Sequence, residues 1–217
     1  MALSPNHLRG GLVQVDPTTS RVLRVIALQY NPDTLSRTLS VQATGGGGAG
    51  GERSQALRLR GAATETIRLE AELDATDHLE DPDANATATE VGIHPQLAAL
   101  ESLVHPTADA LANNHALASS GTLEILPLEA PLTLFVWSRQ RVVPVRVTDL
   151  SVTEEAFDVN LNPIRAKVTL GLRVLSVDDL GFDHRGGTLF MGYLRNKEGL
   201  ATAAPAATLS ALGLEGI

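Results

Sequence analysis

The stretch from Ile164 to Val174, IRAKVTLGLRV, decides the fold class of this chain. Its even-numbered positions are all apolar, and its odd-numbered positions are basic, threonine or glycine. Successive side chains of a β-strand point to opposite faces of a sheet. This period of two therefore predicts a strand with one buried face.

The same alternation recurs along the chain. It runs through Ile67–Leu73, Val143–Val147 and Phe157–Leu161, and further strands are expected at Leu12–Val15, Val22–Tyr30, Leu35–Ala43, Ala56–Arg60 and Leu132–Trp137. Turn-forming residues separate several of these segments, as at Asp16–Ser20 and Ser138–Gln140. Strands spaced in this way favour a mainly β chain of α+β character, built as an antiparallel β-barrel or sandwich.

One of these strands carries two irregularities. After Val147 the apolar phase slips by one residue to Leu150 and Val152, so we expect a bulge near Asp149. Pro144 has no N–H to donate to a neighbouring strand. We therefore expect the strand to begin at Pro144 or to lie at a sheet edge there.

One or two short helices interrupt the strands. Pro95 suits a first helical turn, and the leucines that follow it recur at helical spacing, which predicts an inserted helix over about residues 94–105. A second helical piece is expected over Thr107–Leu117. The glycine run Gly45–Gly51 predicts a flexible loop, and the acidic, turn-rich stretch Asp74–Thr89 predicts another.

These elements divide the chain into a β domain over residues 11–176 and a C-terminal extension over residues 177–217. The end of the extension, from about Thr202, is rich in alanine and leucine and shows little pattern, so we expect a tail.

Composition excludes several functions. The formal net charge of −8 argues against binding to nucleic acid and to anionic membranes, because both require a basic surface. The chain has no cysteine, so disulfides, thiol catalysis and thiolate metal sites are excluded. No apolar run approaches the length of about 18 residues that a membrane span needs, and the N-terminal residues show no apolar signal core. We expect a soluble protein of the cytoplasm.

A search for catalytic motifs finds none. The six histidines form no HExxH pair, the acidic residues between Asp74 and Asp83 lack the EF-hand pattern, and no GxSxG or phosphate-binding loop occurs. A hydrolase with dispersed carboxylates among Glu154, Glu155 and Asp158 is the weakest interpretation. We therefore expect no enzyme activity, no catalytic residues, no cofactor and no metal.

Three stretches carry a resemblance to a known family. They are Ala27–Leu39 (ALQYNPDTLSRTL), Val91–Pro106 (VGIHPQLAALESLVHP) and Pro131–Ser176, which contains NPIRA. Together they resemble the tube-related proteins of contractile injection systems, the phage-tail-like particles of bacteria. The chain is most similar to the adaptor or tube-initiator member of the baseplate hub. It lacks the length after Ser176 for the LysM module that some members carry.

The resemblance implies a tail-tube-like β domain and a structural role. It implies a homo-oligomer, a hexameric ring between the central spike and the inner tube, which contacts these and other baseplate proteins and joins its sheets into a closed barrel. The particle would assemble in the cytoplasm and can be released afterwards. Family-like positions that we expect at partner interfaces are Tyr30, Asn31, Pro32, Asn162, Pro163 and Arg165. The alternatives are an inner tube subunit of the same particle, or a β-sandwich that binds peptidoglycan or another carbohydrate.

Overall fold

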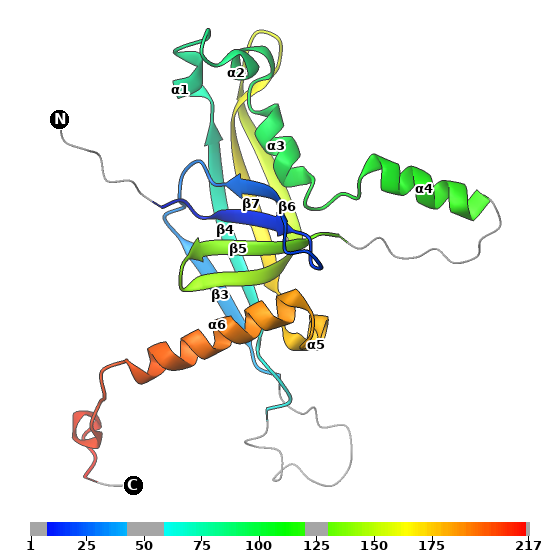
Figure 1. Cartoon of the computed structure of the whole chain (residues 1–217). Coiled ribbons are helices and arrows are strands. Elements are labelled where there is room, and N and C mark those ends of the chain that lie inside the picture. Colours follow the sequence, from blue (N-terminus) through cyan, green and yellow to red (C-terminus); the bar gives the residue numbers. More distant parts are fainter. Residues whose placement is uncertain (1–7, 43–58, 120–129, 216–217) are drawn as a thin grey trace, which may run out of the picture.

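The computed structural model describes residues 8–42, 59–119 and 130–215. Within them, seven strands form one antiparallel sheet in the order β2-β1-β5-β6-β7-β4-β3, with helices around it (Figure 1). The strands are β1 (Gly11–Val15), β2 (Val22–Ala27), β3 (Leu35–Ser40), β4 (Thr64–Asp74), β5 (Leu132–Ser138), β6 (Arg141–Phe157) and β7 (Pro163–Val174). The helices are α1 (Thr76–Leu79), α2 (Ala86–Val91), α3 (His94–Glu101), α4 (Ala108–Ser119), α5 (Val177–Leu180), α6 (Arg185–Thr202) and the 3₁₀ helix η2 (Leu209–Leu212). This confirms the predicted mainly β, α+β class.

The strands β4 and β7 lie side by side and follow the alternation that the sequence predicts. Leu69 of β4 is paired with Leu170 of β7, and both side chains are buried. The next pair, Glu70 and Thr169, points to the opposite face, where Glu70 is exposed. The sheet therefore has one apolar face and one polar face along these strands.

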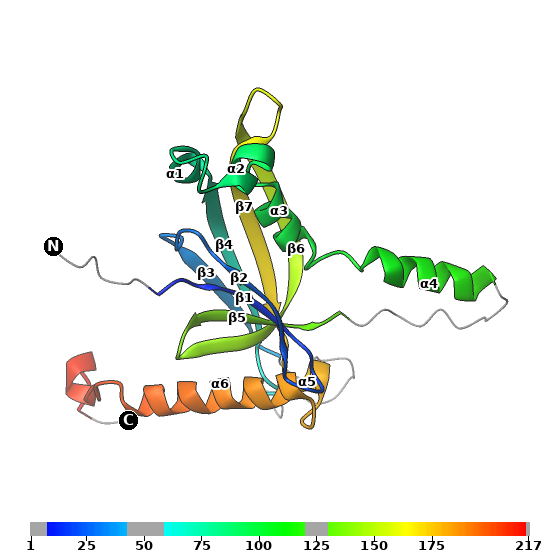
Figure 2. The same ribbon diagram turned by 45° about the horizontal axis from the view of Figure 1, so that its top comes forward.

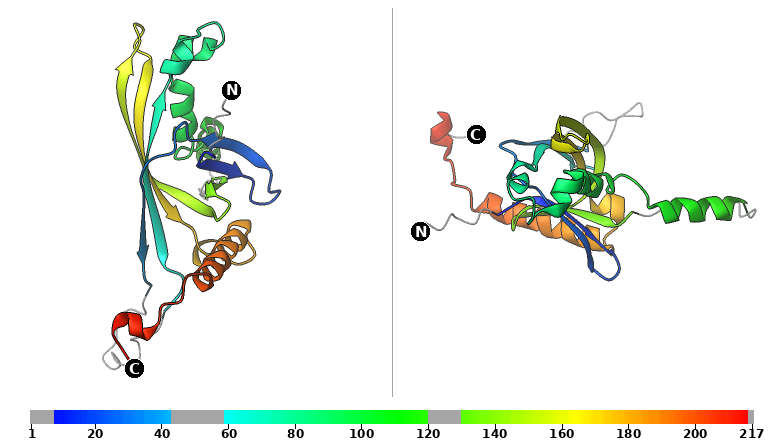
Figure 3. Two further views of the ribbon diagram at one scale, coloured as in Figure 1. Left: turned by 90° about the vertical axis from the view of Figure 1, so that its left-hand side faces the viewer. Right: turned by 90° about the horizontal axis from the view of Figure 1, so that it is seen from above.

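The long strand β6 belongs to both halves of the sheet. Residues 141–145 pair with β5, and residues 145–157 pair with β7. The register shifts between Val147 and Asp149, which confirms the predicted bulge. Bulges increase the local bend and twist of a strand, and β1, β2 and β5 accordingly turn across the apolar face of β4 and β7 (Figure 3, left).

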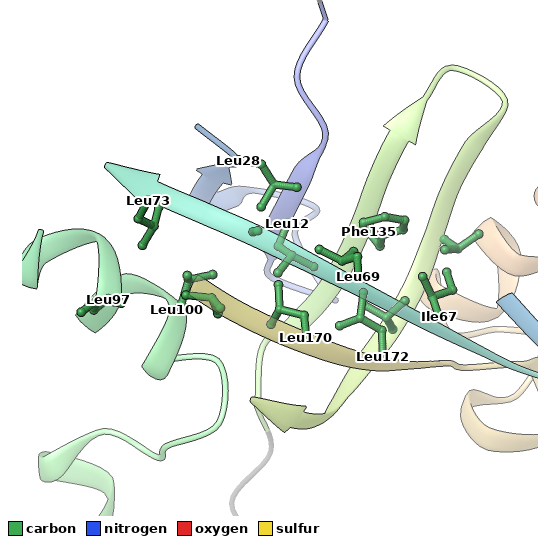
Figure 4. Close-up of a cluster of buried hydrophobic side chains, with 14 of the residues drawn as sticks. Leu12, Leu28, Ile67, Leu69, Leu73, Leu97, Leu100, Phe135, Leu170 and Leu172 are labelled. Atoms are coloured by element: carbon green, nitrogen blue, oxygen red, sulfur yellow. The ribbon is translucent and has the colours of Figure 1, made fainter. Parts of the chain in front are cut away.

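The core forms where the two halves of the sheet face each other. Leu12 of β1 and Phe135 of β5 lie against Leu69, Leu170 and Leu172, and all five side chains belong to one buried cluster (Figure 4). The arrangement is a single bent sheet rather than a closed barrel, because β2 and β3 end the sheet without pairing to each other in the described residues.

Two helices complete this core. Leu97 and Leu100 of α3 belong to the same cluster (Figure 4), as do Phe190 and Tyr193 of α6. The predicted helix over residues 94–105 is too long at its C-terminal end, because α3 ends at Glu101 and a turn follows. The predicted second helix is confirmed as α4.

Two further sequence predictions differ from the structure. Of the strand predicted over Phe157–Leu161, only Phe157 belongs to a strand, as the last residue of β6, and a hairpin turn follows. The Asp158 carboxylate accepts the backbone N–H groups of Asn160 and Asn162 and holds the chain in this turn. Leu161 there has a positive φ of 65°. The acidic stretch Asp74–Thr89 is not a plain loop, since it contains α1 and the start of α2.

Pro144 was expected at a strand start or a sheet edge, and the structure shows a local edge rather than a strand start. It is the fourth residue of β6 and pairs with Leu134 of β5, whereas the pairing of β6 with β7 begins only at Val145. The N–H and C=O of one strand residue point to the same side, and the Pro144 carbonyl accepts from Leu175, just beyond the end of β7. The side of Pro144 that lacks an N–H therefore faces the end of β7, where the pairing of β6 with β7 has already stopped. The predictions for Gly45–Gly51 and for most of Ala56–Arg60 lie outside the described residues.

Candidate assembly interface

The half-sheet β6–β7–β4–β3 has a polar face that no described helix covers, since α3, α5 and α6 lie on its other side (Figure 3, left). Residues that pair directly across an antiparallel sheet share a face. The strand registers therefore assign a common set of side chains to this polar face. It comprises Ser36 and Thr38 of β3, Thr66, Arg68, Glu70 and Glu72 of β4, Arg165, Lys167, Thr169, Gly171 and Arg173 of β7, and Asp149, Ser151 and Thr153 of β6.

Ion pairs cross the polar face from strand to strand. Lys167 Nζ lies 2.9 Å from Glu155 Oε1, and Arg68 Nη2 lies 3.1 Å from Asp149 Oδ1. The hydrogen bond from Arg68 holds the pKa of Asp149 below its usual value, and the hydrogen bond that Lys167 donates to Glu155 raises the pKa of Lys167. These pairs are partly exposed, so they orient the side chains more than they stabilise the fold.

Gly171 explains how the Arg68–Asp149 pair forms. Arg68 is on β4 and Asp149 is on β6, so their side chains meet across β7, directly over Gly171. A Cβ at Gly171 would fall 1.7 Å from Asp149 Oδ2. Only a residue without a side chain allows this bridge, and the glycine in the deciding stretch IRAKVTLGLRV therefore has a packing role.

The half-sheet also has free edges on both sides. Within the described residues, β3 pairs only with β4, and from Arg146 onward β6 pairs only with β7. Apolar side chains stand at both edges, with Leu39 of β3 51% exposed and Phe157 of β6 49% exposed. A free strand edge presents unpaired backbone groups and is a template for pairing with another chain.

The predicted interface residues Tyr30, Asn31 and Pro32 form the connection between β2 and β3. The Asn31 side chain is engaged within the chain, because its Oδ1 accepts the Gly10 N–H at 2.8 Å and its Nδ2 donates to the Leu8 carbonyl at 2.8 Å. It thus fixes the entry to β1. Tyr30 is 46% exposed and, with Pro32, borders a shallow polar depression on the surface.

Asn162 and Pro163 lie at the start of β7 and join the hairpin to the helical segment. Asn162 Nδ2 donates to the Glu90 carbonyl at 3.0 Å, and the Pro163 carbonyl accepts the Ile93 N–H at 2.9 Å. Gly92 has a positive φ of 60°, and a Cβ there would fall 2.2 Å from the Pro163 oxygen. The family-like stretches that contain VGIHP and NPIRA are therefore packed against each other.

Arg165 pairs with Asp74 on the neighbouring strand, with its Nη2 2.7 Å from Asp74 Oδ2, and its side chain remains 44% exposed. The backbone of Asp74 in turn bonds twice to the amide of Gln29, at 2.6 and 2.9 Å. Burial alone raises the pKa of Asp74, but hydrogen bonds from Thr76 and Arg165 lower it overall. Asp74 thus connects the Tyr30 segment to Arg165, which brings the two groups of predicted interface residues close together.

Sequence reasoning missed a buried ionic cluster beneath the sheet. Glu65 of β4 is 3% exposed and accepts from Arg37 Nε at 2.7 Å, Lys197 Nζ at 2.9 Å and the Tyr193 hydroxyl at 3.1 Å. Burial alone raises the pKa of Glu65, but the two cations lower it overall. The alternation through Ile67–Leu73, continued back by two residues, assigns Glu65 to the buried face, and this signal could have found it.

Comparison with known proteins adds little to this geometry. No protein-family model matches the chain, and no curated protein matches it significantly. Two solved structures are similar at 14% and 11% sequence identity: a chain from the tail of an empty gene transfer agent particle with C6 symmetry, and a chain from the virion of a native gene transfer agent particle. Each alignment covers 76% of this chain and 90% of the other, with TM-scores of 0.28 and 0.27. Scores this low carry no argument about fold or function. No helix in the described part of the chain is long and apolar enough to cross a bilayer.

Proposed function

We propose that this chain is a structural subunit of a contractile, phage-tail-like injection particle, where it acts as the adaptor that joins the central spike to the inner tube. The observation that carries the proposal is the half-sheet β6–β7–β4–β3, which combines an uncovered polar face with a free edge on either side. The order of the family-like stretches along the chain supports the same role.

Physical reasoning connects this half-sheet to a ring. A free edge on each side lets the β6 edge of one copy pair with the β3 edge of the next, which is a heterologous contact that generates a ring when the rotation closes. Closure removes the free β3 and β6 edges of the joined half-sheets. The polar face then lines a water-filled lumen, where exposed charges keep their hydration.

The adaptor and the inner tube subunit are two roles for the same half-sheet. The described chain carries further elements beside that half-sheet, namely α4 and the C-terminal α5, α6 and η2. An inner tube subunit contacts only copies of itself along the tube, whereas an adaptor also contacts a spike. The adaptor therefore needs these additional elements more than the tube subunit does. We therefore favour the adaptor, and the role needs no bond-making chemistry, so we propose that the protein is not an enzyme.

The test begins with a tagged chain expressed in its native host. Particles are isolated on a density gradient, imaged by negative stain and quantified by mass spectrometry. A few copies per particle together with sheath, tube and spike proteins support the adaptor. Copy numbers equal to those of the tube protein make it the tube subunit. A free chain that associates with no particle overturns the proposal.

Edge substitutions refine this test. Leu39→Lys and Phe157→Lys place a charge at the two edges that we propose to join, so incorporation into particles should fall while the thermal stability of the monomer changes little. Val22→Lys is the matched control, because Val22 is 55% exposed on β2, the free edge that the ring does not use. If all three variants enter particles equally, the proposed pairing of β3 with β6 of the next copy is refuted.

A further inference from the structure

The C-terminal residues 203–215, which we call the C-terminal arm, leave the body of the molecule without packing on it. Every residue of the arm is exposed, including Leu209, Leu212 and Leu214 at 42%, 71% and 44%. Its hydrogen bonds are local, as in Leu214 N–H to the Leu209 carbonyl. Leucines that remain this exposed lack the burial energy that apolar side chains gain in an interface.

A groove of complementary character lies elsewhere on the surface, and we call it the Arg24 groove. It is lined mainly by apolar side chains, among them Leu103, Val104, Pro106 and Pro131, beside Arg24 of β2. Val104 is 41% exposed within it. The volume is about 510 Å³, within the range of roughly 300–1,000 Å³ that accommodates ligands and anchoring side chains.

Charge is complementary between the arm and the groove. Among the described residues that line the groove, Arg24 is a cation and none is a carboxylate. The only charged residue of the C-terminal arm is Glu215. An apolar segment with a single acidic residue therefore matches an apolar groove with a basic side chain at its wall.

The arm and the groove lie on opposite sides of the molecule. The C-terminal arm leaves at the left in Figures 1 and 2, whereas α4, at whose base the groove opens, leaves at the right (Figures 1 and 2). The view from above shows the same separation (Figure 3, right). The arm of one copy is therefore poorly placed to fill its own groove and well placed to fill that of a neighbour.

The arm and the groove lie on the same two sides of the molecule as the β3 and β6 edges that we propose to join. β3 and β4 lie on the side of the arm, and β6 lies on the side of the groove (Figure 2). A neighbour whose β6 edge meets β3 therefore also presents its Arg24 groove toward the arm. Residues 203–215 would reach about 40 Å if η2 unwound into an extended chain.

We propose that the C-terminal arm of one copy docks its leucines in the Arg24 groove of the next copy and so links the subunits head to tail. This inference rests on the proposed ring, whose contacts it specifies. In a heterologous contact of this kind, each copy binds the next through its arm. In a closed ring, every arm is then docked and every groove is occupied.

The absence of cysteine from the sequence gives a sharp test. The full chain carrying both Leu212→Cys and Val104→Cys is oxidised and run on a non-reducing gel. Docking between copies predicts a ladder of covalent oligomers from this double variant, whereas each single variant stops at a dimer. A disulfide within one monomer, or no ladder at about 100 µM chain, overturns the proposal. Leu8→Cys combined with Val104→Cys is the control, because Leu8 is 80% exposed and lies outside both surfaces.

A complementation experiment gives an independent readout. Leu212→Asp removes the arm's central leucine and keeps the groove, while Val104→Asp alters the groove and keeps the arm. The mixture should sediment as a larger species than either variant alone, because the intact arm of Val104→Asp can dock in the intact groove of Leu212→Asp. A mixture that sediments like the separate variants contradicts the proposal.

The two proposals fail in different ways. A ladder from a chain that enters no particle leaves the arm contact standing and overturns the injection-particle function. A chain that enters particles but gives no ladder keeps that function and removes the arm contact.

Discussion

The clearest energetic prediction concerns Glu65, the buried carboxylate that joins β4, β3 and α6. We consider Glu65→Gln, which keeps the shape of the side chain and removes its charge. Arg37 and Lys197 then lose their anionic partner, and the Tyr193 hydroxyl keeps only a neutral acceptor. The change therefore tests whether this ionic cluster holds the C-terminal helix on the sheet.

The magnitude follows from the exposure of the partners. Removing one member of a fully buried pair costs about 3–5 kcal/mol. Here the side chains of Arg37 and Lys197 are 26% and 33% exposed, so both cations regain part of their hydration. The loss should then be nearer the range of about 1.5–3 kcal/mol for hydrogen bonds to charged groups. We expect about 2 kcal/mol of unfolding free energy, or roughly 4–8 °C in Tm for a chain of this length.

The pH dependence supplies a second signature. The pKa of folded Glu65 lies below 4.5, the usual value for a glutamate side chain. Its ionised form therefore stabilises the fold above the unfolded pKa, and this contribution is lost as pH falls through the folded pKa. The gap in stability between the wild-type chain and Glu65→Gln should be full at pH 7 and should narrow below about pH 4.5.

Thermal unfolding followed by circular dichroism at pH 7 and at acidic pH measures both effects, and hydrogen exchange reports whether the end of α6 near Lys197 opens first. Glu72→Gln is the control, because Glu72 is on the same strand but on the exposed polar face, where a change within about 0.5 kcal/mol is expected. If the Tm of Glu65→Gln lies within about 1 °C of the wild-type Tm at pH 7, the ionic cluster does not contribute the expected stability.

Three further substitutions test the surface network. Gly171→Ala should destabilise the chain by at most about 1 kcal/mol, seen as a slightly lower Tm, because the new Cβ displaces the partly exposed Asp149 carboxylate from Arg68. Asn31→Ala removes two hydrogen bonds to the backbone and should cost about 1–2 kcal/mol, with faster hydrogen exchange at the start of β1. Arg165→Glu places like charges beside Asp74 and should lower Tm more than Arg165→Gln does, so the neutral variant is the better one for assembly assays.

One matched control lies on the same strand, and each of these predictions has an outcome that would contradict it. Thr169→Val, on the same face of β7 as Gly171, should leave Tm nearly unchanged, and a Gly171→Ala chain as stable as wild type would show that the bridge over β7 is dispensable. Unchanged exchange in Asn31→Ala would mean that the entry to β1 is held by its strand pairing alone. Equal Tm values for the two Arg165 variants would mean that solvent screens the neighbouring carboxylates.

The sequence by itself determined the features that depend on local periodicity. The alternation in IRAKVTLGLRV and around Ile67 fixed which side chains of β7 and β4 are buried, because a strand has a period of two whatever its neighbours are. The phase slip after Val147 located the bulge, and the turn residues located the hairpin between β5 and β6. Local pattern failed at Phe157–Leu161, where backbone N–H groups that donate to the Asp158 carboxylate convert an alternating segment into a turn.

Only the tertiary structure decided what the family-like residues do within the chain. Asn31, Asn162 and Pro163 bond to backbone groups that are distant in sequence, and Arg165 pairs across strands with Asp74. No local pattern specifies such partners, since they depend on strand order and register. The same holds for the polar face and the free edges of the half-sheet, which exist because strands far apart in sequence pair in one order and leave their outer backbone groups unpaired.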